Sequence, residues 1–185
     1  MRCGIWGLRC AGPDATILAA MFFTHISSPV GDLLAASNGA AITQLEFDEK
    51  HQRPVSGRRA PGEFASLRAQ LAAYFAGELR DFELPLAPHG AEFEQRVWAV
   101  LLTIPYGTTT SYGAIARRLK APNAARAVGT ANGRNPIAIV IPCHRVIGAD
   151  GSLTGYGGGL SRKRLLLELE SSRSGLFELT PSHRA

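Results

Sequence analysis

The sequence of 185 residues has little cysteine, little charge and no long apolar run. Three cysteines are too few for a disulfide framework, which favours a reducing compartment, and we expect a cytoplasmic protein. No apolar run approaches the ~18 residues that a membrane helix requires, so a membrane-spanning protein is excluded. Charged residues form 19% and hydrophobic residues 45% of the chain, which is typical of a globular protein.

Acidic residues are absent from one long stretch. No carboxylate lies between Glu94 and Asp150, and residues 95–185 carry a net charge of +8, against −3 for residues 1–94. The basic residues of the acid-free stretch are Arg96, Arg117, Arg118, Lys120, Arg126, Arg134 and Arg145. This charge suits a polyanion, most simply nucleic acid, and a basic surface that only aids solubility is the alternative.

The first half of the chain predicts a small sheet with one helix. Residues 1–20 are interrupted by Gly, Pro and Asp, so they make a poor signal peptide and are expected to be a disordered extension. The elements predicted next are strands within 22–47 separated by Pro-Val-Gly-Asp and Asn-Gly turns, a loop over 48–62, a helix over 63–75 that stops at Gly77, and an edge strand over 81–86. We therefore expect an N-terminal α/β domain over 21–86, followed by a linker at 88–90.

The second half of the chain predicts mostly helices. The predicted elements are a helix over 93–101, short helices over 112–119 and 124–133, a buried strand or extended segment over 137–141, a glycine-rich loop over 148–159, a helix over 161–170 and a tail over 172–185. Two short helices joined by a tight turn on an acid-free segment are typical of a helix-turn-helix. The second of these helices is rich in Ala and Gly, so its backbone can approach a partner closely.

Cys143 and His144 follow the buried run directly. A thiol becomes a good nucleophile when a nearby base or cation favours its thiolate. Neighbouring residues of an extended segment point in opposite directions, so this pair needs a bend or a bridging water to communicate. A buried structural cysteine is the alternative. A zinc site is not expected, because Cys3 and Cys10 lie far away in sequence.

A wider set of motifs carries a family resemblance. The string from Asn135 to Ile147, which contains Pro-Cys-His-Arg-Val, is preceded by Tyr112 and by Arg126-Ala-Val-Gly, and is followed by Gly155-Tyr156. In this order and spacing, the motifs closely resemble the O6-alkylguanine-DNA alkyltransferases, also called methylated-DNA–protein-cysteine methyltransferases. The resemblance covers residues 89–171 and, more loosely, 21–86.

The resemblance implies an α/β (α+β) fold in two parts. The N-terminal part is a small ribonuclease H-like sheet domain, and the C-terminal part is a winged-helix-like helix-turn-helix domain that holds the active site and binds DNA. The implied function is DNA repair by direct, stoichiometric transfer of an alkyl group from O6-alkylguanine to Cys143, with O4-alkylthymine as a second candidate substrate. The implied protein is a monomer that needs no cofactor and no metal.

The resemblance also implies roles for single residues. Cys143 accepts the alkyl group, His144 acts through a water as the base, Glu170 orients the imidazole, and Tyr112 donates to N3 of the guanine. Their structural alternatives are a solvated helix carboxylate for Glu170 and a half-buried packing ring for Tyr112.

The remaining implied roles concern DNA and the pocket. Arg126 fills the gap that a flipped nucleotide leaves in the duplex, in the minor groove. Asn135 ties the helix-turn-helix to the active-site loop. Further DNA contacts are implied for Ala127, Thr110, Ser111 and Arg134, and pocket positions for Val146, Tyr156, Gly157 and Asn132.

Two other functions fit parts of the sequence. Alkyltransferase-like proteins bind damaged DNA on the same fold but lack the cysteine, so the presence of Cys143 argues against that class. A cysteine hydrolase with a Cys-His-Glu relay leaves the basic helix-turn-helix without a purpose.

Overall fold

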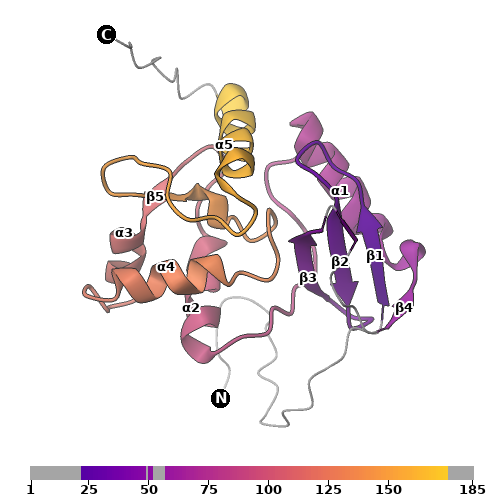
Figure 1. Cartoon of the computed structure of the whole chain (residues 1–185), viewed down its shortest axis with the longest axis horizontal. Coiled ribbons are helices and arrows are strands. Elements are labelled where there is room, and N and C mark those ends of the chain that lie inside the picture. The colour runs from indigo at the N-terminus through magenta and orange to yellow at the C-terminus, as the bar shows by residue number, and fades with distance from the viewer. Residues whose placement is uncertain (1–21, 49, 52–56, 175–185) are drawn as a thin grey trace.

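The structure is a computed structural model that describes residues 22–48, 50–51 and 57–174 (Figure 1). The predicted extension over 1–20 and the predicted tail beyond residue 174 lie outside these described residues. Within them, no helix has the length and apolar character needed to cross a bilayer.

The N-terminal part is a four-stranded sheet with a helix against it (Figure 1). Its strands are β1 (Phe22–Ile26), β2 (Leu33–Ser37), β3 (Ile42–Phe47) and β4 (Arg58–Arg59), in the order β3-β2-β1-β4. The three long strands pair antiparallel, and β4 pairs parallel with β1. The predicted turns are present: Asn38 Oδ1 accepts hydrogen bonds from the amides of Ala40 and Ala41 across the Asn-Gly turn. β2 is buried along its whole length and forms the centre of the sheet.

Helix α1 (Ala65–Ala76) follows the 3-10 turn η1 (Pro61–Phe64) and covers one face of the sheet. It buries Leu67, Leu71 and Tyr74. Gly77 ends the helix with a left-handed φ of 76°, a conformation that glycine adopts without strain, as the sequence predicts.

Two predictions for this part are wrong. The segment 48–62, predicted as a loop, contains β4, because a two-residue Arg-Arg strand carries no apolar alternation to reveal it. The edge strand predicted over 81–86 is not formed, and only Leu86 makes an isolated bridge, to Ile42. Pro85 has no amide hydrogen to donate, but its carbonyl accepts the Ile42 amide at 2.8 Å.

The C-terminal part is helical, with a very short sheet. Its helices are α2 (Glu92–Leu101), α3 (Tyr112–Arg118), α4 (Ala125–Gly133) and α5 (Leu160–Ser174), and β5 (Thr110–Ser111) pairs parallel with β6 (Val146–Ile147). α5 continues four residues beyond the predicted end at Glu170. Trp98 of α2 donates from Nε1 to the carbonyl of Ala131 in α4 at 2.8 Å. A Cβ at Gly90 would lie 2.4 Å from the Trp98 ring, so only glycine fits there.

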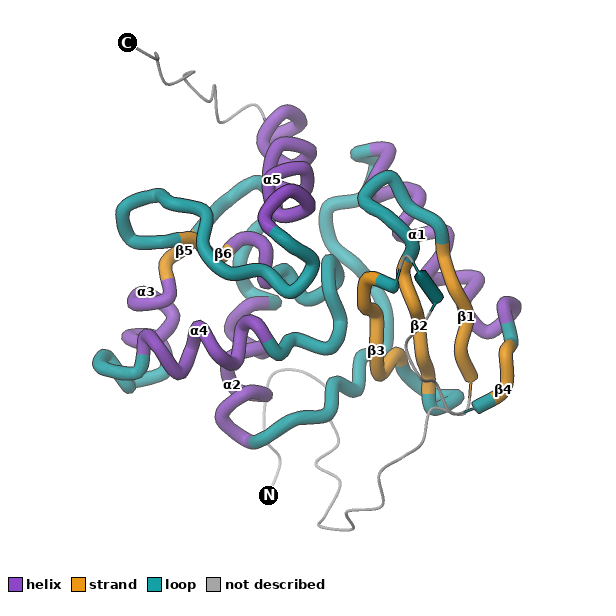
Figure 2. The backbone as a smooth tube through the Cα atoms, viewed as in Figure 1, coloured by secondary structure: helices purple, strands orange, loops and turns teal. Residues whose placement is uncertain are grey.

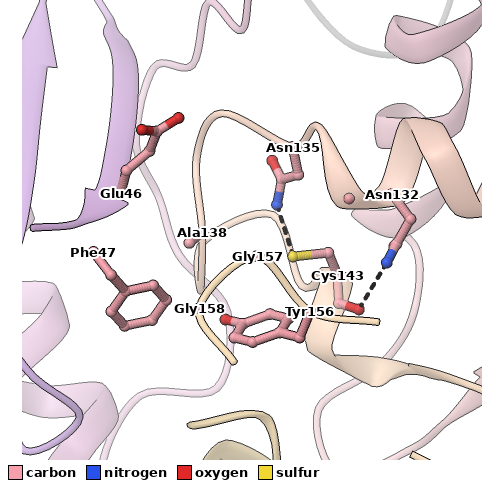
Figure 3. A pocket seen from close by; sticks show the side chains of 10 residues that line it. Glu46, Phe47, Asn132, Asn135, Ala138, Cys143, Tyr156, Gly157 and Gly158 are labelled. Carbon is pink, nitrogen blue, oxygen red and sulfur yellow. Dashed lines mark hydrogen bonds between the residues drawn. The ribbon is translucent and has the colours of Figure 1, made fainter. Parts of the chain in front are cut away.

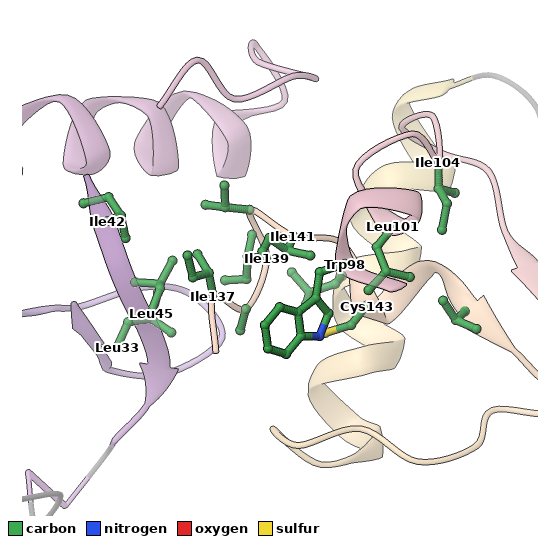
Figure 4. Close-up of a cluster of buried hydrophobic side chains, with 14 of the residues drawn as sticks. Leu33, Ile42, Leu45, Trp98, Leu101, Ile104, Ile137, Ile139, Ile141 and Cys143 are labelled. Atoms are coloured by element: carbon green, nitrogen blue, oxygen red, sulfur yellow. The ribbon is translucent and has the colours of Figure 1, made fainter. Parts of the chain in front are cut away.

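The segment 137–141 packs between the two parts and forms a turn, so both predicted alternatives, a strand and an extended segment, are wrong (Figure 2). Ile137 forms a single bridge with Leu45 of β3, and the chain then turns, with Ile139 at a φ of 71°. The predicted burial is correct, since Ile137 and Ile141 are fully buried. Figure 4 shows these isoleucines between the sheet residues and Trp98, so one continuous core spans both parts.

Candidate active site

The chemistry-bearing residues lie on a 3-10 turn, η2 (Cys143–Arg145), directly after Pro142. This turn is the bend that the Cys-His pair needs. Cys143 faces a pocket, whereas His144 is fully buried and contacts Glu170 of α5. The two neighbouring side chains therefore face opposite sides of the turn, Cys143 toward the pocket and His144 toward the core.

The pocket beside Cys143 has a volume of about 110 Å³ (Figure 3). Both parts of the chain contribute to its lining, which consists of Glu46, Phe47, Asn132, Gly133, Asn135, Ala138, Cys143, Tyr156, Gly157 and Gly158. Of the predicted pocket residues, Asn132, Asn135, Tyr156 and Gly157 are in this lining. Val146 is not: it is fully buried beneath the site, and its carbonyl accepts a hydrogen bond from Lys163.

Asn135 connects the end of α4 to the active-site turn. Its Nδ2 donates to the carbonyl of Ile141 at 2.8 Å and to Sγ of Cys143 at 3.1 Å, and its Oδ1 accepts the Ile137 amide at 3.0 Å. Asn132 donates to the Cys143 carbonyl at 3.4 Å. Both asparagines therefore fix the position of the cysteine relative to the helix-turn-helix.

The thiol of Cys143 is protonated in the resting protein. Its residue is 5% exposed, and burial raises the pKa of the thiol to about 11, although the Asn135 hydrogen bond and the Lys163 charge oppose this rise. Since the thiolate is the nucleophilic form, the site needs a base that removes the proton when a substrate is bound.

His144, the next residue, is the candidate for that base. Its Nε2 lies 2.9 Å from Oε1 of Glu170. Burial lowers the pKa of His144, against the raising effect of Glu170, so the ring is neutral near pH 7 and Nε2–H donates to the carboxylate. Nδ1 then carries the lone pair, and it is buried with no hydrogen-bond partner among the residues that the structure describes.

The carboxylate of Glu170 receives five hydrogen bonds. The donors to Oε1 are Tyr74 Oη at 2.8 Å, His144 Nε2 at 2.9 Å and Arg145 Nη2 at 2.9 Å; the donors to Oε2 are Arg145 Nε at 2.9 Å and the Gly107 amide at 3.1 Å. Burial raises the pKa of Glu170, but the hydrogen bonds and charges of His144 and Arg145 outweigh it and lower the pKa to about 2. Glu170 is therefore a buried anion, not the solvated carboxylate of the alternative interpretation.

Unlike the other basic residues of the acid-free stretch, Arg145 is buried. It counts among the basic residues of the acid-free stretch, but it is 5% exposed and grips Glu170 with two nitrogens. Its Nη1 donates to the Ile104 carbonyl at 2.6 Å. This guanidinium balances a buried charge and is not part of a DNA-facing surface.

Lys163 of α5 is a buried charged residue near Cys143 that the sequence analysis missed. Its fully buried ammonium donates to the carbonyl oxygens of Val146, at 2.5 Å, and Thr154, at 2.6 Å. Burial lowers its pKa to about 8, so it is mostly charged at neutral pH, and this charge lowers the pKa of the Cys143 thiol. Because Lys163 stands among other charged residues of the helix, the sequence does not indicate that it is buried and its neighbours are exposed.

The helix-turn-helix consists of α3 and α4, with Lys120 at a φ of 58° in the turn between them. Arg126 and Ala127 lie on the exposed face of α4. Thr110 and Ser111 are half-exposed, and Ser111 Oγ caps α3 by accepting the Ala114 amide at 3.2 Å. These four predicted DNA contacts are therefore open to a partner.

Two further predicted residues are engaged within the chain. Arg134 is exposed and forms an ion pair with Glu94 at 2.9 Å. The Tyr112 hydroxyl donates to the Thr154 carbonyl at 3.4 Å, and its ring is half-buried outside the pocket lining. A Cβ at Gly129 would lie 3.7 Å from this ring, so the small residue of α4 sits beside it.

A basic helix-turn-helix beside a pocket, with a cysteine backed by a histidine–glutamate pair, defines the class: a DNA-binding protein that reacts through a cysteine. Within the described residues, no group of three His, Cys, Asp or Glu side chains could hold a metal ion.

Comparisons with known proteins give the family. The family models for the ribonuclease-like domain and the DNA binding domain of 6-O-methylguanine DNA methyltransferase match residues 21–88 and 92–172. The methylated-DNA–protein-cysteine methyltransferase of Mycobacterium tuberculosis (strain H37Rv) is 57% identical over 82% of this chain and 93% of its own. That of Methanosarcina acetivorans is 48% identical over 82% and 99%. The crystal structure of Mycobacterium tuberculosis OGT in complex with DNA matches with a TM-score of 0.79, at 56% identity, over 83% of this chain and 94% of that one.

The chain belongs to the 6-O-methylguanine DNA methyltransferase family. The resemblance and the α+β fold class expected from the sequence are confirmed.

The sequence analysis also missed side chains that the N-terminal part contributes to the site. Glu46 and Phe47 line the pocket from β3, and Tyr74 of α1 reaches Glu170. All three come from the N-terminal part, where the sequence shows only strand alternation and helical spacing. Their roles depend on contacts between distant segments, which local patterns do not encode.

Proposed function

We propose that this protein repairs DNA by transferring the alkyl group of O6-alkylguanine in duplex DNA to Cys143. The observation that carries the proposal is the Cys143 thiol, which lines a pocket with a neutral, buried His144 behind it and an exposed helix-turn-helix beside it. The names of the relatives, methylated-DNA–protein-cysteine methyltransferases, support the same reaction.

The reaction starts with removal of the thiol proton. A water between Sγ of Cys143 and Nδ1 of His144 carries the proton to Nδ1, and the anionic Glu170 stabilises the imidazolium that forms. Sγ then attacks the alkyl carbon, so an S–C bond forms while the O6–C bond breaks. The electron pair of that bond passes to the guanine.

The Tyr112 hydroxyl supplies a proton to N3 of the departing guanine, exchanging its contact with the Thr154 carbonyl for the base. The Tyr112 phenolate then regains a proton from solvent, and the His144 imidazolium releases the thiol proton to solvent, so both side chains return to their neutral forms. The resulting thioether does not leave Cys143, so each protein molecule reacts once. No cofactor is needed for this balance.

The target base is proposed to leave the duplex through the minor groove. Arg126 on the exposed face of α4 fills the gap, because a guanidinium can stack and donate hydrogen bonds there. The adjacent Ala127 lets the backbone approach the groove, and Thr110 and Ser111 contact phosphates. Arg134 joins them only if DNA competes with its ion pair to Glu94.

We further propose that the protein works as a monomer in the cytoplasm, where thiols stay reduced. The helix-turn-helix and the pocket beside Cys143 belong to the same chain, which supports this state.

A repair titration tests the proposed function. Increasing amounts of an O6-methylguanine duplex are added to a fixed amount of protein, and the restored guanine is counted after reaction. We expect restored guanine to level off at one per protein molecule, with none for Cys143→Ser. Continued turnover would point to a hydrolase, and binding without repair would point to the damage-recognition class.

A further inference from the structure

A hydroxyl from the N-terminal part contacts the carboxylate of the active-site relay. Tyr74 of α1 donates from Oη to Oε1 of Glu170 at 2.8 Å, across a sequence separation of 96 residues. Both residues are buried, at 0% and 1% exposure. The same oxygen accepts a hydrogen bond from Nε2 of His144, so Tyr74 and the proposed base share one acceptor atom.

Packing explains the ring of Tyr74 but not its hydroxyl. The ring contacts Phe75 and Phe82 at centroid distances of 5.3 Å and Tyr106 at 6.0 Å. A phenylalanine would make these contacts equally well, without burying a polar group. The hydroxyl is thus placed in a buried aromatic cluster where its acceptor is the relay carboxylate.

We propose that Tyr74 is a positioning residue for alkyl transfer: its hydroxyl restrains Oε1 of Glu170 and disperses part of the charge that this oxygen directs at His144. The base therefore stays neutral and able to accept a proton. This inference rests on the proposed function and deepens it, because it makes the reactivity of the C-terminal site depend on α1 of the N-terminal part.

The direction of the effect follows from the groups around the relay. Glu170 is faced by His144 and Arg145 from η2, by the Gly107 amide and by Tyr74 from α1. Without the Tyr74 donor, Oε1 holds its charge more tightly against His144, so the imidazolium gains stability and the pKa of His144 rises. The charge of Arg145 and that of Lys163 in α5, which both lower this pKa, stay in place.

The rate of alkyl transfer reports this change because only neutral His144 accepts the thiol proton. We compare single-turnover rates between pH 5 and 9 for the full chain, Tyr74→Phe and Tyr106→Phe, with free O6-benzylguanine as substrate so that base flipping does not contribute. Tyr106→Phe is the matched control, since it deletes a neighbouring hydroxyl that lies 3.5 Å from the Leu169 carbonyl instead of Glu170.

In the plot of rate against pH, the acid limb is the range in which the rate rises as His144 loses its proton. We expect this limb to lie about half a unit to one unit higher in pH for Tyr74→Phe, and at the same pH as in the unmodified protein for Tyr106→Phe. Incorporation of a fluorotyrosine at position 74, a stronger donor with the same shape, should move the limb to lower pH. This second variant keeps the test decisive if Tyr74→Phe folds poorly.

Acid limbs that coincide in all variants would overturn the inference, even if Tyr74→Phe lowers the melting temperature. A merely structural tyrosine changes stability and not the limb. Failure of the unmodified protein to restore guanine in the O6-methylguanine duplex would instead refute the proposed function, and the inference with it.

Discussion

Replacing Glu170 with glutamine removes a buried negative charge while it keeps the size of the side chain. Arg145 then loses its counter-charge. When the NH2 group of the glutamine faces His144 or Tyr74, two hydrogen-bond donors face each other and no hydrogen bond forms. The structure gives the magnitude. Lowering the pKa of Glu170 from 4.5 to about 2 corresponds to on the order of 3 kcal/mol of folding free energy at neutral pH.

The pH dependence of this contribution has a definite sign. The folded pKa lies below the unfolded one, so the stabilisation is present in full above about pH 5.5 and is lost as pH falls toward the folded pKa. We therefore expect Glu170→Gln to be less stable than the unmodified protein by about 3 kcal/mol at pH 7. This difference in the free energy of unfolding should narrow by about 1 kcal/mol at pH 4, and it should narrow further below pH 4.

Urea unfolding at pH 7, 5 and 4 measures the gap, with Glu168→Gln as the control. Glu168 is an exposed carboxylate on the same helix, so its replacement should change stability by less than about 0.5 kcal/mol. A Glu170→Gln gap below about 1 kcal/mol at pH 7, or one that does not narrow with acid, would refute the account of Glu170 as a stabilised buried anion.

Two further substitutions test the DNA face and the thiol. Arg126→Ala should slow repair of an O6-methylguanine duplex about 10- to 100-fold and leave the rate on free O6-benzylguanine unchanged, since only the duplex requires flipping. Arg118→Ala is the control for the loss of a positive charge from the helix-turn-helix. Equal losses of rate on both substrates would contradict the flipping role of Arg126. Lys163→Met should raise the pKa of the Cys143 thiol by about one unit, because a nearby positive charge is lost. The pH dependence of iodoacetamide labelling measures this shift. Arg164→Met, which replaces an exposed residue of the same helix, should not change the labelling profile. An unchanged profile for Lys163→Met would show that Lys163 does not influence the thiol.

Local signals in the sequence predict much of the fold. The Asn-Gly turn and the Gly77 stop follow from the backbone needs of single residues. The helix-turn-helix follows from two short helical segments joined by a tight turn. The apolar run 137–141 misleads because its composition is that of a strand, whereas Pro136 and Pro142 flank it and Ile139 turns the chain at a positive φ. Arg58 and Arg59 form β4 through pairing with β1, which neither residue signals on its own.

Some residues of the candidate site could likewise be predicted from the sequence, and others could not. Cys143 and His144 stand in a motif that carries the family resemblance, and the resemblance implies Glu170 as the partner of His144. The structure places Glu170 against His144, the neighbour of Cys143. Arg145 and Arg126 carry the same charge in the same acid-free stretch, but one is buried against Glu170 and the other is exposed. Only the tertiary structure separates them, because burial is decided by what the rest of the chain places around each side chain.

The most direct test of the central claim is the intact mass of the protein after incubation with an O6-methylguanine duplex, followed by peptide mapping. We predict a gain of about 14 Da, located on Cys143 and absent from Cys143→Ser, because the thioether is a stable product. An unchanged mass, or a methyl group on a different residue, would contradict the assignment of Cys143 as the alkyl acceptor.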